Sequence, residues 1–180
     1  MMEEQDVILV DREDKPVGTM KKMEAHRKGA LHRAFSIFIF DPRGRMLLQK
    51  RSAEKYHGGG LWTNACCSHP LPEEGIESAA SRRLFEELGF TTPLKKLFSF
   101  TYEAEVENGL IEHEFDHVFI GVYDQKVKVD PSEVADYAYE DMERIKWAIE
   151  NQPSKFTSWF KLAFPKIEEW WKKEFDSSDS

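Results

Sequence analysis

The order of strands and helices along the sequence predicts an α+β domain in which a mixed β-sheet lies between helices. Residues 33–40 are nearly all apolar or small, which is typical of a strand buried on both faces. Two hairpins are indicated, over residues 33–51 and 94–124, around turns at 41–44 and 107–109 that contain Gly with Asp, Asn or Pro. Helical patterns at 75–88, 141–150 and 156–175 separate or follow these hairpins.

The elements outside the two hairpins complete this pattern. Residues 7–10 form a short apolar strand, 14–18 a turn, and 19–25 a brief helix that a loop joins to the strand at 33–40. A further strand is expected at 126–129. Pro153 ends the helix at 141–150, and Pro165 is expected to kink or split the last helical region.

Length and charge limit the class of protein. The 180 residues fit a single domain over 1–180 with a sizeable core, and a disordered tail is expected at about 176–180. Hydrophobic residues make up 41% of the chain and charged residues 32%, as in ordinary globular proteins. The formal net charge of −8 excludes broad attraction to nucleic acid or to an anionic membrane. An anionic ligand would therefore need a local basic pocket.

The two cysteines and the N-terminus indicate where the protein works. Cys66 and Cys67 are neighbours, and because a disulfide between neighbours is strained, we expect free thiols in a reducing compartment. The first residues are acidic where a secretory signal would carry lysines, and no apolar run reaches membrane-spanning length. We expect a cytoplasmic monomer that binds neither nucleic acid nor membrane.

The segment from residue 61 to residue 90 concentrates reactive side chains next to one helix. Cys66, Cys67 and His69 are expected in a short loop before the helix at 75–88, which Gly89 ends. Arg83 and Glu87 fall one turn apart within the apolar face of this helix. An internal ion pair is the simpler explanation, and a bound ligand is the alternative.

The strand at 111–124 carries a row of acids. Alternation places Glu112, Glu114 and Asp116 on one face of the sheet. A solvated face and a bound cation explain this row about equally well. Together with His26, His32 and His69, the two glutamates form a candidate site for Mn²⁺ or Zn²⁺, with Mg²⁺ also possible.

Basic residues near strand and helix ends could form the required anion pocket. The candidates are Lys22, Arg51, Lys55 and Arg83. Scattered surface charge is the plainer explanation for them. If they converge, they suit a diphosphate, and a second metal ion on Glu87 would share its negative charge.

The segment at 68–90 resembles the Nudix box. Glu74, then after seven residues Arg82, followed by Leu84, Glu86, Glu87, Gly89 and Phe90, match the spacing of that box. Two positions depart from it: Ser68 replaces a glycine, and Arg83 replaces a glutamate that helps to bind the hydrolytic metal cluster. The second departure argues against hydrolysis of a phosphoanhydride.

Over nearly its whole length the chain also resembles the type 1 isopentenyl-diphosphate isomerases, which have a Nudix-like fold. The resemblance lies in the segments TNACCSHP (63–70), LIEHE (110–114) and FTSW (156–159) together with Arg83. It implies that isopentenyl diphosphate and dimethylallyl diphosphate are interconverted through a tertiary carbocation. Protonating an alkene carbon demands a dry site with one acid and one base, which agrees with this activity.

The resemblance also implies a role for each matching residue. Cys67 and Glu114 match the catalytic thiol and the catalytic acid on opposite faces of the substrate. Tyr102 matches a tyrosine that hydrogen-bonds this glutamate, and Trp159 matches a tryptophan over the cation. The remaining matches are metal ligands (His26, His32, His69, Glu112 and Glu114), diphosphate-side residues (Lys22, Arg51, Lys55 and Arg83), and a site for substrate-bound Mg²⁺ (Glu87 and the carbonyl of Cys67).

Two other classes of function remain open at this point. One is a Nudix hydrolase acting on a nucleoside diphosphate derivative, against which Arg83 argues. The other is a non-enzymatic module in which Cys66, Cys67 and His69 belong to a structural zinc site. A closed zinc site would have four ligands and no basic pocket beside it.

Overall fold

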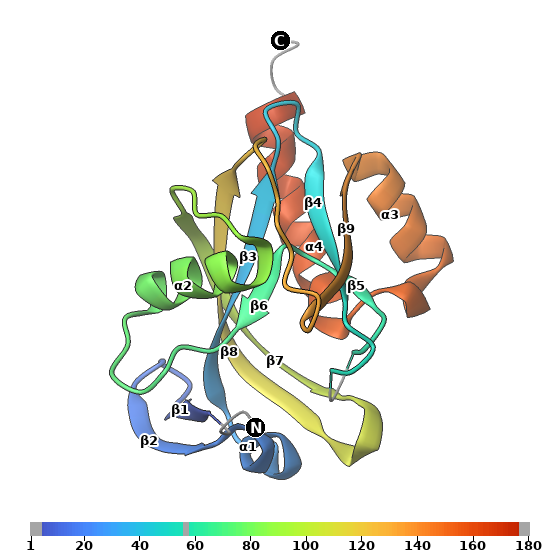
Figure 1. Ribbon diagram of the computed structural model, residues 1–180. Coiled ribbons are helices and arrows are strands. Elements are labelled where there is room, and N and C mark those ends of the chain that lie inside the picture. The colour runs from blue at the N-terminus through green and yellow to red at the C-terminus, as the bar shows by residue number, and fades with distance from the viewer. Residues whose placement is uncertain (1–4, 56–57, 177–180) are drawn as a thin grey trace.

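A computed structural model describes residues 5–55 and 58–176 (Figure 1). Most of the tail predicted at about 176–180 lies outside these residues. No helix in the described ranges is long and apolar enough to cross a membrane. The elements, in chain order, are β1 (Asp6–Val10), β2 (Pro16–Lys21), α1 (Lys22–Lys28), β3 (His32–Phe40), β4 (Met46–Arg51), β5 (Trp62–Thr63), β6 (Cys66–Ser68), α2 (Ile76–Leu88), β7 (Lys95–Glu105), η1 (Glu107–Gly109), β8 (Ile111–Val122), β9 (Val134–Glu140), α3 (Met142–Asn151), η2 (Pro153–Lys155), α4 (Ser158–Trp171) and η3 (Lys172–Asp176).

Strand β3 organises a single mixed sheet. Along one edge it pairs in parallel with β8, from His32 opposite Glu114 to Phe40 opposite Val122. Along its other edge β1, β6 and β4 follow one another, each antiparallel to it. Strand β7 extends the sheet beyond β8, and β9 pairs with β4. The two predicted hairpins are confirmed, and the parallel pairing joins them.

The two faces of β3 contribute to two separate cores, which makes the sheet the middle layer of the fold. Phe35, Ile37 and Ile39 pack with buried residues of α2. Phe38 and Phe40 pack with buried residues of α3 and α4. Figure 1 shows α2 in front of the sheet and α4 behind it. The prediction of an α+β fold with a mixed sheet between helices is therefore confirmed.

Some local predictions were wrong, and tertiary hydrogen bonds explain those that concern strands. Residues 19–21 belong to β2 because Met20 pairs with Val7, so the helix starts only at Lys22. Residues 66–68 form a strand because they pair with β3. Residues 126–129 form no strand, since the amide of Lys128 bonds to the carbonyl of Leu88 at the end of α2. Strand β9, which pairs with β4, was missed. A split of the last helical region at Pro165 was also wrong, because α4 continues through this residue.

The acidic row on β8 is buried. Glu112, Glu114 and Asp116 are exposed by 5% or less, so the explanation of a solvated face is wrong. The same face of β8 continues with Val118 and Ile120, which belong to the core under α4. The row of acids is therefore the polar end of a core face, and burial of several carboxylates needs partners of opposite charge or a bound cation.

Candidate active site

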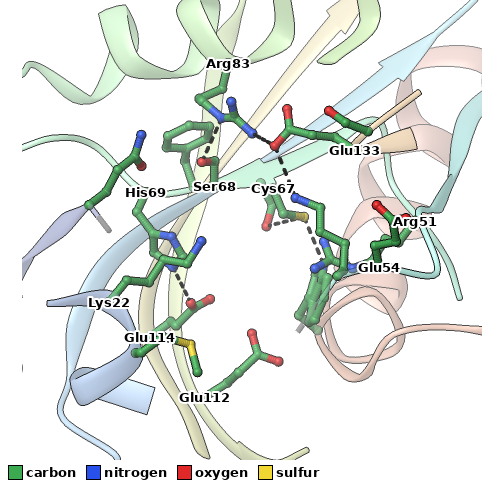
Figure 2. A pocket seen from close by; sticks show the side chains of 17 residues that line it. Lys22, Arg51, Glu54, Cys67, Ser68, His69, Arg83, Glu112, Glu114 and Glu133 are labelled. Atoms are coloured by element: carbon green, nitrogen blue, oxygen red, sulfur yellow. Dashed lines mark hydrogen bonds and ion pairs between the residues drawn. The ribbon is translucent and has the colours of Figure 1, made fainter. Parts of the chain in front are cut away.

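One cavity collects most of the residues singled out in the sequence. It has a volume of about 480 Å³, and Figure 2 shows the side chains that line it. The predicted site residues that line it are Lys22, Arg51, Lys55, Cys67, His69, Arg83, Glu112, Glu114 and Trp159. His32 and Tyr102 contact Glu114, Glu87 contacts Arg83, and the ring of His26 lies beside that of His69. Segments far apart in the sequence thus converge on this cavity.

The Cys67 thiol is held by three polar side chains. Its register in β6, opposite Ser36 of β3, directs Sγ to the α4 side of the sheet, while Cys66 packs on the α2 side. The indole Nε1 of Trp159 donates to Sγ at 2.9 Å. Sγ lies 3.1 Å from Oδ1 of Asn64 and 3.5 Å from the Ser36 hydroxyl.

Burial keeps Cys67 protonated, although the hydrogen bonds of Ser36 and Asn64 act to lower the pKa of its thiol. Burial raises the pKa of the thiol far above its ordinary range, and the nearby carboxylate of Asp116 raises it further. The amide nitrogen of Asn64 donates to the carbonyls of Ile37 and Cys66, which leaves its oxygen to accept from the thiol. Cys67 is therefore a half-buried, oriented thiol and not a free thiolate.

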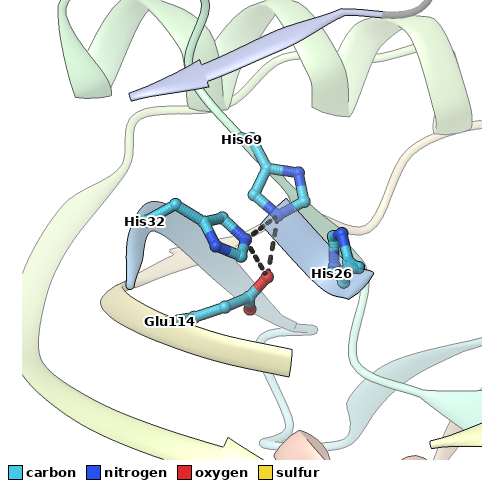
Figure 3. A group of neighbouring side chains, drawn as sticks. All are labelled: His26, His32, His69 and Glu114. Carbon is cyan, nitrogen blue, oxygen red and sulfur yellow. Dashed lines mark hydrogen bonds and ion pairs between the residues drawn. The ribbon is translucent and has the colours of Figure 1, made fainter. Parts of the chain in front are cut away.

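A group of three histidines and one glutamate can hold a metal ion. One ligand atom from each of His26, His32, His69 and Glu114 lies within 4.8 Å of the others (Figure 3). The Nε2 atoms of His32 and His69 lie 3.1 and 2.7 Å from Oε2 of Glu114. Glu112, the fifth predicted ligand, does not belong to this group, although it lines the same cavity.

The protonation states of this group suit a cation. Nδ1 of His26 and of His32 lies within hydrogen-bond distance of a backbone carbonyl, at 2.7 and 2.9 Å, so this nitrogen carries the hydrogen. Nε2 is then the lone-pair nitrogen. Burial lowers the pKa of His69 to about 3. Burial opposes ionisation of Glu114, but His69 and His32 hold its pKa well below its usual range. Neutral imidazoles and an ionised carboxylate are the forms that bind divalent metals.

Tyr102 fixes the other oxygen of Glu114. The tyrosine belongs to β7, directly opposite Glu114 in β8, and its hydroxyl donates to Oε1 at 2.5 Å. The hydroxyl also lies 3.5 Å from Oε2 of Glu112. With Oε2 engaged by two histidines, both oxygens of the Glu114 carboxylate have defined partners, so the group cannot rotate freely.

The four predicted basic residues all line this one cavity, so the explanation of scattered surface charge is wrong. Burial lowers the pKa of Lys22 to about 8, and the positive charges of Lys55, Arg83 and Arg51 add to the effect. The guanidinium of Arg51 lies 5.2 Å from the centre of the Trp159 ring. A concentrated positive field of this kind is suited to a polyanion such as a diphosphate.

Arg83 is the most connected of these cations. Its Nη2 donates to Glu87 and to Glu133, each at 2.7 Å, and its Nε donates to the Ser68 hydroxyl. Glu87 also accepts from Gln49 at 2.9 Å, and burial raises its pKa although Arg83 opposes the shift. The ion pair between Arg83 and Glu87 that the sequence suggested is present, and it lies next to the cavity.

Polar residues of the site that were not predicted from the sequence include Asn64, Ser36 and Glu133. Asn64 and Ser36 contact the thiol, and Glu133 contacts two of the basic residues. Asn64 lies in the segment TNACCSHP together with Cys67, and this closeness in sequence could have predicted a contact with the thiol. Ser36 lies in an apolar strand, and Glu133 lies in a polar turn, where neither stands out.

Comparisons with known proteins agree with this geometry. The NUDIX domain model matches residues 30–160. The chain is 48% identical over 175 residues to an isopentenyl-diphosphate Delta-isomerase of Pectobacterium atrosepticum, covering 97% of each chain. It is 51% identical over 169 residues to an isopentenyl-diphosphate Delta-isomerase 2 of Photorhabdus laumondii, covering 91% of this chain and 96% of that one.

Solved structures support the fold alone. A Deinococcus radiodurans protein is similar with a TM-score of 0.76 and 17% identity, covering 90% of this chain and 98% of that one. A MutT protein from Methanosarcina mazei is similar with a TM-score of 0.64 and 19% identity, covering 77% of this chain and 94% of that one.

Proposed function

The chain belongs to the Nudix-domain proteins and, among them, to the isopentenyl-diphosphate Delta-isomerase family, and we propose that it interconverts isopentenyl and dimethylallyl diphosphate using Cys67 and Glu114. The observation that carries the proposal is that one cavity is lined by both a protonated thiol, from β6, and an ionised carboxylate, from β8 (Figure 2). Moving the double bond requires that one proton be added to a carbon and another removed. The chain supplies one group in each state.

The two groups exchange roles with the direction of the reaction. In one direction the Cys67 thiol protonates the terminal alkene carbon, the positive charge develops on the tertiary carbon, and Glu114 removes a proton from the neighbouring carbon. The reverse reaction starts from the opposite protonation states. Tyr102 and the two histidines hold the Glu114 carboxylate in one orientation, which is what proton transfer to and from carbon requires.

Trp159 protects and stabilises the carbocation in this proposal. It is 4% exposed, lines the cavity, and donates to Cys67 from its indole nitrogen. An aromatic face attracts a cation by on the order of 2 kcal/mol when water is excluded. Exclusion of water also prevents capture of the cation, which would give an alcohol in place of an alkene.

Metal ions complete the proposed site. We assign Mn²⁺, Zn²⁺ or Mg²⁺ to His26, His32, His69 and Glu114, with Glu112 beside them, and Mg²⁺ bound with the substrate to Glu87 and the carbonyl of Cys67. A cation at the first site would orient Glu114 and bias its protonation. Lys22, Arg51, Lys55 and Arg83 would bind the diphosphate, whose binding energy positions the short hydrocarbon chain.

The free thiols indicate the compartment in which the protein works. Both cysteines are free, and Cys67 must remain reduced to donate a proton. We therefore propose that the protein acts in the reducing cytosol, as a monomer, on a small-molecule substrate.

Proton NMR of the purified protein with isopentenyl diphosphate and Mg²⁺ in D₂O tests this function. We expect dimethylallyl diphosphate to form, with deuterium in the new methyl group, because the added proton comes from a group that exchanges with solvent. Release of inorganic phosphate from nucleoside diphosphate derivatives, with no dimethylallyl product, would instead identify a hydrolase. Unfolding on chelation, with no turnover of either substrate, would identify a structural metal module.

A further inference from the structure

Glu133 is a carboxylate within the cluster of cations that the proposed function assigns to the diphosphate. It lies in the turn before β9, where its amide bonds to the carbonyl of Asp130 at 3.0 Å. Its own carbonyl accepts from the amide of Ser52, just after β4, also at 3.0 Å. The backbone is thus held from two sides, and the side chain lines the cavity (Figure 2).

The carboxylate of Glu133 joins two of the basic residues. Oε1 accepts from Nη2 of Arg83 at 2.7 Å and from Nζ of Lys55 at 3.2 Å. The side chain of Glu133 is 16% exposed, and those of Arg83 and Lys55 are 13% and 21% exposed. Ion pairs that are this well shielded from water are screened far less than surface pairs.

Glu133 carries its negative charge in this environment. Burial acts to raise its pKa, but the hydrogen bond and charge of Arg83, followed by the charge of Lys55, lower the pKa below its ordinary value. Glu87 is a second carboxylate on the same Nη2 atom. Any anion that approaches Arg83 therefore meets two carboxylates as well as the cations.

We propose that Glu133 makes the pocket selective for diphosphate that carries a divalent cation over free diphosphate. The proposal rests on the proposed function, because it takes Lys55 and Arg83 as the diphosphate-side cations. Free diphosphate is a polyanion that the carboxylates of Glu133 and Glu87 repel. A divalent cation cancels two units of that charge and attracts the same carboxylates.

The same contacts give Glu133 a positioning role before substrate arrives. Lysine and arginine side chains have many rotamers, and like charges drive them apart. Glu133 holds the ends of Lys55 and Arg83 at one oxygen atom, so both are directed to the cavity. A neutral glutamine of the same shape would keep part of this geometry and remove the repulsion.

Calorimetric titration with inorganic diphosphate tests the proposal. Binding is measured with and without added Mg²⁺, after loosely bound divalent ions have been removed by gel filtration, for the wild type and for Glu133→Gln. The quantity compared is the ratio of the Kd without Mg²⁺ to the Kd with Mg²⁺. We expect this ratio to fall about tenfold in Glu133→Gln, mainly because free diphosphate binds more tightly. A fall of less than about threefold would overturn the proposal.

Glu54 provides the matched control. It is another carboxylate that lines the cavity, but it makes no ion pair with a residue in the described part of the chain. Glu54→Gln should leave the ratio within about threefold of the wild type. If it lowers the ratio as much as Glu133→Gln does, the effect belongs to net charge alone and the assignment to Glu133 is overturned.

Three negative outcomes can be told apart: a variant that does not fold, a wrong proposed function, and a wrong inference about Glu133. Circular dichroism checks that each variant is folded. If Glu133→Gln does not fold, the titration is repeated with Glu133→Ser, which is also neutral. If the wild type binds no diphosphate under either condition, the proposed function fails, and the inference about Glu133 falls with it. If the wild type binds and the ratio does not respond to either neutral variant, only the inference fails.

Discussion

Arg83 donates from Nε to the hydroxyl of Ser68 at 3.1 Å, so the two positions at which the chain departs from the Nudix box contact each other. The same guanidinium bonds to Glu86 at 3.2 Å and to Glu87 at 2.7 Å, the two acids that the box retains in this helix. Arg83 thus places a positive charge among carboxylates, at the position where the Nudix box has a further glutamate that helps to bind a metal cluster. The two departures therefore form one contact that adds a positive charge beside the retained acids.

This contact predicts that Ser68 and Arg83 are coupled in ligand binding. In a double-mutant cycle, Ser68→Ala should weaken binding of Mg²⁺-diphosphate several-fold and Arg83→Gln more strongly. The double variant should bind about as well as Arg83→Gln alone, which corresponds to a coupling free energy of about 1 kcal/mol. Calorimetry measures all four proteins. Ser78→Ala, on the exposed side of α2, serves as the uncoupled control, and additive effects of Ser68 and Arg83 would contradict the prediction.

Removal of either proton-transfer group should stop the isomerase reaction. We expect Cys67→Ala and Glu114→Gln each to lower kcat by about 10³-fold or more, within the range of lost acid–base catalysis. Binding of diphosphate should remain, because neither side chain belongs to the basic cluster. The rate of dimethylallyl diphosphate formation and calorimetric titration measure the two properties. Cys66→Ala is the matched control, since Cys66 packs in the α2 core and should affect stability more than kcat. Full activity of either catalytic variant would refute the assignment.

Binding of a divalent metal should stabilise the fold through the histidine group. A ligand that binds only the native state at 100 times its Kd adds about 2.7 kcal/mol to the free energy of unfolding. We expect Mn²⁺ or Zn²⁺ to raise the Tm of the metal-free wild type and to have little effect on His69→Ala. His113→Ala is the control, because His113 lies outside the group. An equal rise of Tm in all three proteins would mean that the metal binds elsewhere.

Local pattern was sufficient to predict elements in which apolar residues recur regularly. The mostly apolar strand β3 and the helix α2, with its apolar stripe and terminal Gly89, were both found from the sequence. Strand β9 was missed because Asp136 and Tyr137 face solvent and its order comes from pairing with β4. Residues 126–129 have strand-like alternation, but the amide of Lys128 bonds to the carbonyl of Leu88 at the end of α2 instead. Tertiary hydrogen bonds thus override local preference at both places.

The site could be predicted where its residues carry distinctive chemistry. Histidine, cysteine and paired acids stand out in a sequence, and the parallel pairing of β3 with β8 then brings His32 next to Glu114. That pairing joins segments 82 residues apart and has no local signature. Glu133 and Asn64 were missed for a different reason. Turns and loops are rich in such residues, so only their contacts reveal a role.

Asn64 should be important for stability as well as for the thiol. It is fully buried, and its amide nitrogen donates to the carbonyls of Ile37 and Cys66 at 2.9 and 3.0 Å. Asn64→Ala leaves both carbonyls without this donor, and we expect a loss of about 2–3 kcal/mol in the free energy of unfolding by urea. Asn151→Ala is the control, since its single bond, to the carbonyl of Trp147, is exposed and should contribute less than about 0.5 kcal/mol. Equal losses would contradict the role assigned to Asn64.

His117 should make the protein less stable in acid. Its Nε2 lies 2.8 Å from Oδ2 of Asp14, whereas its buried Nδ1 has no hydrogen-bond partner among the described residues. Burial lowers the pKa of His117 although Asp14 opposes the shift, so the folded state resists a second ring proton. The pKa in the unfolded chain is about 6.5. Between that value and the lower folded pKa, the unfolded state binds more protons, and stability therefore falls as the pH falls.

The pH dependence can be isolated by comparison with His117→Asn, which can still bond to Asp14. Other titrating groups are common to both proteins, so they cancel in the difference between the two free energies of unfolding. From about pH 7 to about pH 5 this difference should change by up to about 1.4 kcal/mol per pH unit, with the wild type losing stability faster. Urea denaturation at a series of pH values measures it. If the difference between the two free energies of unfolding does not change with pH, His117 has the same pKa in the folded and unfolded states. Burial of its Nδ1 would then not contribute to the loss of stability in acid.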